Sequence, residues 1–107
     1  MIDKKRLCGL LGLATRAGKT VFGTEACKSG IEKRKVKLVI IAEDAADRTK
    51  INFKQKCNEI GIPLWEGLEI ETLSKSIGKE NKAIIGITDG NFSKEILKII
   101  NGGEIIG

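Results

Sequence analysis

The chain contains no histidine and no tyrosine, and only 4% of its residues are aromatic. The lack of histidine removes the most common general base near neutral pH and a frequent zinc ligand. The scarcity of aromatic side chains argues against nucleic-acid binding by stacking of bases on a sheet surface. We therefore expect no catalytic residues, no metal site and no other cofactor.

The cysteines also lack the spacing of a metal site or a redox motif. Cys8, Cys27 and Cys57 are far apart, and each lies in an apolar helical pattern, where a free cysteine behaves as a small hydrophobic residue. An odd number without paired spacing is typical of a reducing cytosol, so we expect a cytoplasmic protein. No apolar run reaches the roughly 20 residues that span a bilayer, and the basic start at residues 4–6 has no convincing signal-peptide cleavage site after it. We expect no membrane partner.

Positive charge is concentrated in the first third of the chain. The 107 residues fit a single domain, and an apolar content of 41% is normal for a globular core. Residues 1–37 contain 10 Lys or Arg and 3 Asp or Glu, a net charge of +7, whereas residues 38–107 contain 9 and 11, a net charge of −2. A basic segment of this kind is typical of proteins that bind polyanions. Ordinary solubility charge is the alternative interpretation.

Helical and strand patterns alternate along the chain. Helices are expected at residues 3–17, from Gly23 to the basic run at 33–35, and at 47–61, 70–77 and 91–100, and strands at 20–22, 37–42, 62–65 and 83–88. The apolar run within residues 37–42 suits a strand buried on both faces. Asp3 and Asp47 are expected helix caps, and Gly61 and Gly78 expected helix ends. The pattern predicts a three-layer α/β/α sandwich with five helices and a small mixed sheet of about four strands.

Two segments resemble the sites of nucleotide- or phosphate-dependent enzymes. The segment GLATRAGKT resembles a phosphate-binding loop, but five residues instead of four separate Gly12 from Gly18, and a helix precedes it instead of a strand. Glu43 and Asp44 follow the buried strand and Asp89 follows another, which is the placement of a magnesium site in receiver-like domains. No lysine accompanies them, so solvated turns explain them better. A small phosphate-binding enzyme remains a rival interpretation.

The region around Gly23 favours contact with phosphate groups. Gly23 opens a helix, and a glycine backbone can approach a phosphate closely. The N–H groups and dipole of this helix are expected to form one patch with the cations Arg16, Lys19 and Lys28. Because aromatic residues are few, we expect recognition of a structured RNA by its shape and backbone. The basic run at residues 33–37 is equally explained as a solvated helix end.

Four segments, in this order, resemble bacterial YlxQ-type proteins, a group within the ribosomal L7Ae/L30e superfamily. They are ATRAGKTVFG at residues 14–23, KVKLVIIAED at 35–44, CNEIGIP at 57–63 and LSKSIGKE at 73–80. The resemblance extends from residue 7 to about residue 100 with the spacing intact. It implies an α/β/α sandwich that binds kink-turn RNA.

The resemblance also implies which residues contact RNA. In the family, the second helix reads tandem sheared G·A pairs through a G-x-N-E motif that is followed three residues later by a lysine. Gly23 matches the glycine, whereas Glu25, Ala26 and Ser29 occupy the positions of the asparagine, glutamate and lysine. The family's loop around an extruded nucleotide matches Ile77-Gly78-Lys79.

We therefore expect a non-enzymatic, monomeric, ribosome-associated protein that binds ribosomal or other kink-turn RNA and no small-molecule substrate. Glu25 accepts hydrogen bonds but cannot donate as asparagine does, and Ala26 cannot bond to a guanine edge. The alternative is therefore a protein-interaction module of the same fold without specific RNA binding. The residues expected to contact RNA are Arg16, Lys19, Gly23, Thr24, Glu25, Lys28, Ser29, Glu43, Ile77, Gly78 and Lys79.

Overall fold

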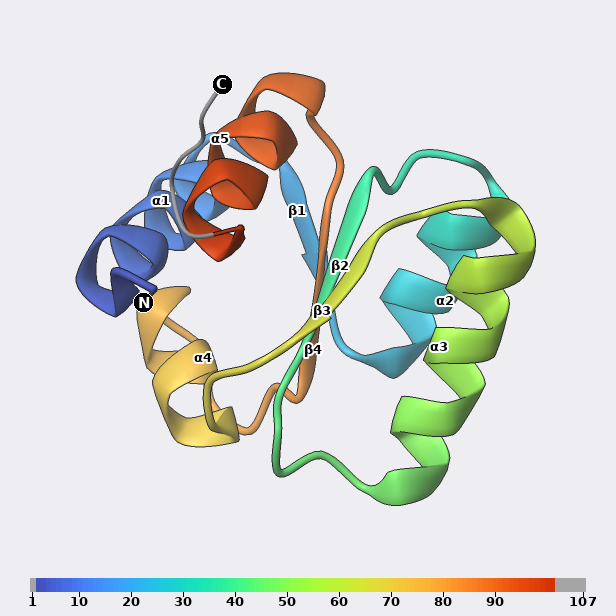
Figure 1. Cartoon of the computed structure of the whole chain (residues 1–107). Coiled ribbons are helices and arrows are strands. Elements are labelled where there is room, and N and C mark those ends of the chain that lie inside the picture. The colour runs from blue at the N-terminus through green and yellow to red at the C-terminus, as the bar shows by residue number, and fades with distance from the viewer. Residues whose placement is uncertain (1, 102–107) are drawn as a thin grey trace.

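Helices and short strands alternate through residues 2–101, the part of the chain that the computed structural model describes (Figure 1). In chain order the elements are α1 (Lys4–Arg16), β1 (Thr20–Phe22), α2 (Thr24–Glu32), β2 (Leu38–Ile41), α3 (Asp47–Ile60), β3 (Leu64–Glu66), α4 (Ile70–Ser76), β4 (Ile84–Ile87) and α5 (Gly90–Ile100). The five predicted helices and four predicted strands are therefore confirmed. The predicted helix end at Gly102-Gly103 lies outside the described residues.

The sheet is mixed, with strand order β1-β4-β2-β3. β4 runs antiparallel to both β1 and β2, whereas β2 and β3 are parallel. All residues of the two central strands, β2 and β4, are buried, as expected for continuously apolar runs. The residues of β1 and β3 are half-buried, which suits their positions at the two edges.

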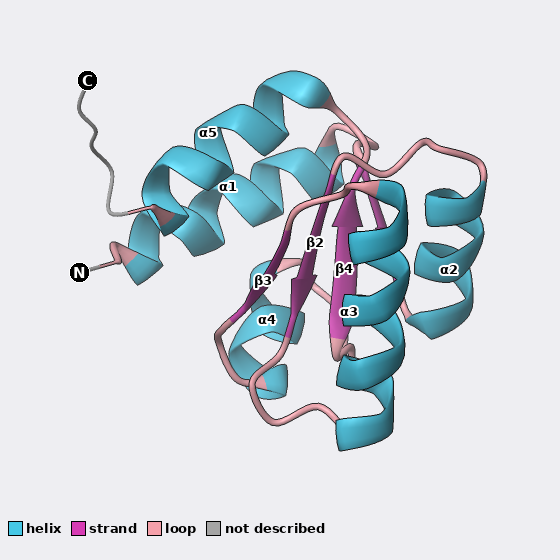
Figure 2. Cartoon of the chain, turned by 45° about the vertical axis from the view of Figure 1, so that its right-hand side comes forward, coloured by secondary structure: helices cyan, strands magenta, loops and turns pink. Residues whose placement is uncertain are grey.

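Helices cover both faces of the sheet, which makes three layers. Figures 1 and 2 show α1, α4 and α5 on one face and α2 and α3 on the other. Apolar side chains at i, i+3 or i+4 spacing face the sheet from each helix; they are Leu7, Leu11 and Ala14, Cys27 and Ile31, Phe53 and Cys57, Leu73 and Ile77, and Ile96 and Ile99. Burial raises the pKa of Cys27 to about 12 and that of Cys57 to about 11, so both thiols serve as packing groups. Ala26, directly before the buried Cys27, is exposed because its position on the helix faces away from the sheet. Within residues 2–101, no helix is both long enough and apolar enough to cross a bilayer.

Of the two predicted N-terminal helix caps, Asp3 is confirmed and Asp47 is wrong. Asp3 accepts a hydrogen bond from the Arg6 N–H at 3.1 Å and caps α1, and Asp89 caps α5 through the Phe92 N–H at 2.9 Å. Asp47 was predicted to cap α3 but is its first helical residue, and the N-cap is Ala46. Its carboxylate therefore acts through the helix dipole instead of a cap hydrogen bond.

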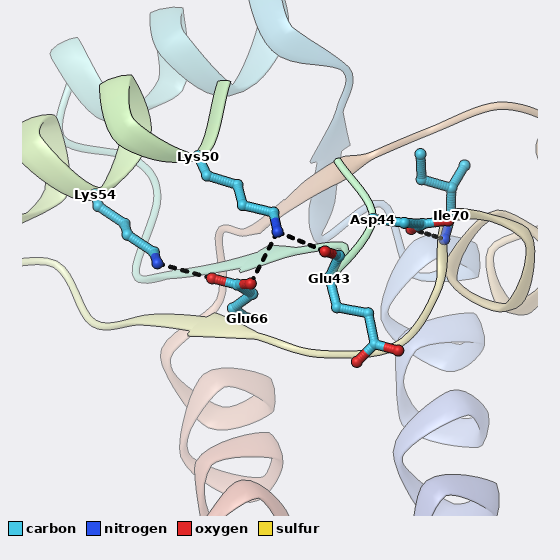
Figure 3. Close-up of polar contacts among 6 residues, drawn as sticks. All are labelled: Glu43, Asp44, Lys50, Lys54, Glu66 and Ile70. Carbon is cyan, nitrogen blue, oxygen red and sulfur yellow. Dashed lines mark hydrogen bonds and ion pairs between the residues drawn. The ribbon is translucent and has the colours of Figure 1, made fainter. Parts of the chain in front are cut away.

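Polar contacts tie the ends of β2 and β3 to α3 (Figure 3). Glu66 pairs with Lys54 at 2.7 Å and with Lys50 at 3.0 Å. The Lys50 ammonium also donates to the backbone carbonyl of Glu43, the second residue after the end of β2. The hydrogen bonds from Lys54 and then Lys50 hold the pKa of the Glu66 carboxyl below its usual value. Asp44, next to Glu43, accepts a hydrogen bond from the Ile70 N–H at 2.8 Å and so caps α4 from another part of the chain.

Candidate nucleic-acid interface

The start of α2 and the loop between α4 and β4 meet at one end of the sheet. The Gly23 N–H donates to the carbonyl of Ile84 at 3.0 Å, which joins the residue that opens α2 to the first residue of β4. The loop at residues 77–83 ends directly before Ile84. Both segments lie at the lower end of the sheet in Figure 1. We call this region, residues 22–25 and 77–83, the Gly23 site.

Two lysines of the loop lie over an aromatic ring at this site. The Lys79 ammonium is 5.0 Å from the centroid of the Phe22 ring, and the Lys82 ammonium is 5.6 Å from it. Each contact of this kind contributes about 0.5–1 kcal/mol at an exposed position. The ring therefore holds two positive charges beside the start of α2. Sequence reasoning missed Phe22 and Lys82, and the available signal was the position of Phe22 directly before Gly23.

The backbone at Gly23 has a conformation that is almost restricted to glycine. Its φ and ψ angles are 91° and 158°, and a Cβ atom there would meet no other atom within 4 Å. No side chain among residues 2–101 caps α2 by a hydrogen bond, so the first N–H groups of the helix can bind an anion. A side chain at position 23 would strain the backbone, and substitution here disturbs the fold as well as any ligand.

The loop that carries Lys79 and Lys82 is fixed by hydrogen bonds. The Ser74 hydroxyl accepts a bond from the Lys82 N–H at 2.7 Å and donates one to the Lys82 carbonyl at 3.1 Å. The Lys79 N–H donates to the Ser74 carbonyl at 2.9 Å. Gly78 turns the chain with a φ of 70°, and Ile77 is buried beneath the turn. Of the predicted loop residues, Ile77 therefore packs in the core, Gly78 makes the turn and Lys79 is an exposed cation.

Arg16 and Glu43 border the same region. Gly12 of α1 packs against the Arg16 guanidinium and the Ser76 carbonyl. A Cβ atom added to it would lie 3.6 Å from an Arg16 guanidinium nitrogen and 2.9 Å from the Ser76 carbonyl oxygen. Arg16 therefore lies near the end of α4 that leads into the loop. The Ala42 N–H donates to the Ala83 carbonyl at 2.8 Å, which places the next residue, Glu43, at the same end of the sheet. The Glu43 side chain is exposed there.

Three of the predicted residues of α2 line a hollow between α2 and α3. Thr24, Glu25 and Lys28 are exposed and line this hollow of about 350 Å³ with residues of α3, whereas Ser29 is half-buried. The α3 residues are Asn52, Phe53, Gln55, Lys56 and Glu59. Lys28 thus lies on the α3 side of α2, one turn beyond Thr24, and does not belong to the Gly23 site as defined above.

Lys19 lies at the opposite end of the sheet from Gly23. Its carbonyl accepts a hydrogen bond from the Thr88 N–H at 2.9 Å, beyond the end of β4. The prediction that Lys19 shares one patch with the start of α2 is therefore wrong. The reason is that the three extended residues of β1 lie between the two positions and separate them by four residue steps, about 13 Å.

The magnesium-site interpretation also fails on geometry. β2 and β4 are antiparallel, so the residues that follow them lie at opposite ends of the sheet. Glu43 and Asp44 are thereby separated from Asp89. Asp44 and Asp89 also have roles as helix caps, for α4 and α5.

Comparison with protein families identifies one match to most of the chain. The pattern of the ribosomal protein L7Ae/L30e/S12e/Gadd45 family matches residues 5–97. The chain is 34% identical over 100 residues to the RNA-binding protein YlxQ of Enterococcus faecium, which covers 94% of this chain and 96% of that protein. It is also 34% identical over 92 residues to the RNA-binding protein YlxQ of Bacillus subtilis (strain 168), and this alignment covers 86% of this chain and 92% of that protein.

Solved structures show the same fold. A protein of unknown function from Bacillus halodurans C superimposes with a TM-score of 0.87 and 32% identity, covering 90% of this chain and 97% of that chain. The Giardia lamblia 15.5kD RNA binding protein superimposes with a TM-score of 0.76 over 92% of this chain and 84% of that chain. At 19% identity, this second likeness shows the fold alone.

Proposed function

Because this chain belongs to the ribosomal protein L7Ae/L30e/S12e/Gadd45 family, we propose that it is a non-enzymatic protein that binds structured, kink-turn-like RNA at the Gly23 site. It acts as a monomer with one RNA-binding domain, in the cytoplasm and in association with ribosomal RNA. Three free cysteines suit this reducing compartment.

The observation that carries the proposal is the meeting of α2's first turn with the lysines of the loop. Uncapped N–H groups, the positive end of the helix dipole and the ammonium groups of Lys79 and Lys82 converge there. Phosphate is the anion that such an arrangement fits. The names of the two YlxQ relatives support RNA as the source of that phosphate.

Contact with the bases is expected to differ from the family pattern. Glu25 is exposed in the first turn of α2, where the family motif has asparagine, and it presents acceptors only. Ala26 is exposed and has no polar side-chain group. We therefore expect the phosphate contacts to contribute more of the affinity, and the contacts to sheared G·A pairs to contribute less.

A pair of double variants tests the proposal on a kink-turn RNA. Lys79→Gln/Lys82→Gln removes two charges at the Gly23 site, and Lys94→Gln/Lys98→Gln removes two from α5 on the other face of the sheet. The first variant should lower the log–log salt slope by about 1.4 to 1.8, because each phosphate contact contributes roughly 0.7 to 0.9. The second should bind as the wild type does. No RNA affinity of the wild type at low salt would contradict the proposal and favour the protein-interaction module.

A further inference from the structure

Five exposed cations gather at the end of the sheet opposite to the Gly23 site. They are Lys19, Lys33, Arg34, Lys35 and Lys37, which we call the second basic surface. Lys19 and Lys37 flank the end of β4, since Thr88 N–H bonds to the Lys19 carbonyl at 2.9 Å and Lys37 N–H bonds to the Ile87 carbonyl at 2.7 Å. Two strand spacings, about 10 Å, separate them. In Figure 1 the connection between α2 and β2, which carries four of these residues, lies at the upper end of the sheet.

The charges on this surface are not neutralised by ion pairs within residues 2–101. The ion pairs of the described chain involve Lys50, Lys54, Lys56 and Lys98, and none of the five cations. Two acidic residues close in sequence to this surface, Glu32 and Asp89, have other partners. Glu32, at the end of α2, pairs with Lys56 at 3.2 Å, and Asp89 caps α5.

The turn that carries three of these cations holds an arginine in a strained conformation. Arg34 N–H bonds to the Ile31 carbonyl at 3.0 Å, and Lys35 N–H bonds to the Gly30 carbonyl at 2.9 Å, which together form a Schellman motif at the end of α2. Arg34 has a φ of 60°, at the position where such motifs usually have glycine. The chain therefore carries an exposed guanidinium where glycine would suit the fold better, which points to a role in binding.

α2 connects the two surfaces. Gly23 opens this helix and Lys33 ends it, so the two residues are about 15 Å apart at 1.5 Å per residue. An RNA arm that leaves the Gly23 site along α2 reaches the second basic surface within about five base pairs, at roughly 3.4 Å per base pair. A continuous phosphate backbone supplies negative charges over this whole distance.

We propose that the second basic surface binds the phosphate backbone of an RNA arm that extends from the Gly23 site along α2. This inference rests on the proposed function. The protein thereby contacts one RNA at two places, and the second contact is independent of base sequence because it consists of cations and phosphates.

The test uses two kink-turn RNAs that differ only in the length of the arm along α2. One arm extends well beyond five base pairs, and the other ends before the second basic surface. Lys33→Gln/Lys35→Gln is compared with Lys4→Gln/Lys5→Gln, which removes the same charge from the far end of α1. The first variant should lose roughly 25- to 60-fold in affinity for the long RNA at 0.1 M salt relative to its loss at 1 M, since each phosphate contact is worth about 5- to 8-fold over that range. It should bind the short RNA as the wild type does.

Arg34→Gly separates binding from stability in a single variant. It should raise Tm by a few degrees, because glycine relieves the left-handed conformation. It should nevertheless lose about 5- to 8-fold in affinity for the long RNA at 0.1 M salt relative to its loss at 1 M. The inference would be overturned if Arg34→Gly bound the long RNA as well as or better than the wild type. It would also be overturned if the two double lysine variants lost equal affinity, or if Lys33→Gln/Lys35→Gln lost equal affinity for both RNAs.

Further outcomes separate this inference from the proposed function. Weaker binding by Lys79→Gln/Lys82→Gln with full binding by Lys33→Gln/Lys35→Gln would overturn this inference alone. A wild type that binds neither RNA would overturn both. Wild-type binding to vesicles with anionic phospholipid, lost in Lys33→Gln/Lys35→Gln while RNA affinity is unchanged, would assign the surface to a membrane and overturn the inference.

Discussion

Ser74 and Lys82 exchange two hydrogen bonds that close the loop between α4 and β4. The hydroxyl of Ser74 accepts from the Lys82 N–H at 2.7 Å and donates to the Lys82 carbonyl at 3.1 Å. Ser74 is only 3% exposed, so both bonds are shielded from water on the Ser74 side. The position of Lys79 and Lys82 over Phe22 therefore depends on a buried hydroxyl that does not itself reach the interface.

Ser74→Ala should destabilise the fold and weaken RNA binding together. It leaves the backbone N–H and carbonyl of Lys82 without their partner, at a cost of about 1–3 kcal/mol. For a chain of this size the expected fall in Tm is roughly 5 to 15 °C. Ser76→Ala is the control, because the Ser76 hydroxyl bonds at 2.7 Å to the Leu73 carbonyl of its own helix. A Ser74→Ala protein as stable as Ser76→Ala would show that the two bonds to Lys82 contribute nothing.

Asp44→Ala should destabilise α4, because it removes the cap on the Ile70 N–H. The expected loss in the free energy of unfolding is about 0.5–2 kcal/mol. Urea denaturation should show a lower midpoint with an unchanged m value. Asp44→Asn keeps an acceptor oxygen and should retain most of the stability. Equal losses in the two variants would mean that the charge of Asp44, and not its hydrogen bond, stabilises the protein.

Glu25→Asn should increase the affinity for kink-turn RNA while Tm changes little. The exposed Glu25 side chain has no hydrogen-bond partner among residues 2–101, and asparagine would supply the donor found in the family motif. One added hydrogen bond of about 0.5–1.5 kcal/mol corresponds to roughly 2- to 12-fold. Glu25→Ala removes the charge without adding a donor and serves as the control. If both variants gain equally, relief of repulsion from phosphate explains the gain, and α2 does not read G·A pairs.

Glu66→Gln should affect stability only above the lowered pKa of the Glu66 carboxyl. Lys54 and Lys50 stabilise its charged form, so its folded-state pKa lies below its unfolded-state pKa. The stabilisation is fully present above the unfolded-state pKa of about 4.3 and is lost as pH falls through the folded value. The difference in Tm between wild type and variant should therefore be small but constant at pH 6–8, since the site is solvent-screened, and should vanish in acid. A difference that persists at pH 2 would contradict this assignment.

The sequence predicted the elements well because their signals are local. The apolar run of Leu38–Ile41 allowed only a buried strand, and Gly61 adopts the left-handed conformation expected at a helix end. The resemblance to a known family placed Gly23 and the loop at residues 77–79 in one site, and the structure brings them together.

Contacts between distant segments could not be predicted in the same way. Lys19 is only four residues from Gly23 in sequence, but an intervening strand carries it to the other end of the sheet. The cap that Asp44 provides for α4 and the pairing of Phe22 with Lys82 join residues 26 and 60 positions apart, and no local pattern encodes them. The strain at Arg34 was also hidden, because a basic run at a helix end has the same sequence whether or not one residue is left-handed.

The most direct test of the central claim is a titration of ¹⁵N-labelled protein with a kink-turn RNA, followed by amide chemical shifts. The account predicts that the largest changes occur at Gly23, Thr24, Glu25, Gly78 and Lys79, where the start of α2 meets the loop. Amides of α5 and of β3, which lie away from this region, should change little. Large changes at α5 or β3 with unperturbed amides at Gly23 and Lys79 would contradict the claim that this end of the sheet binds RNA.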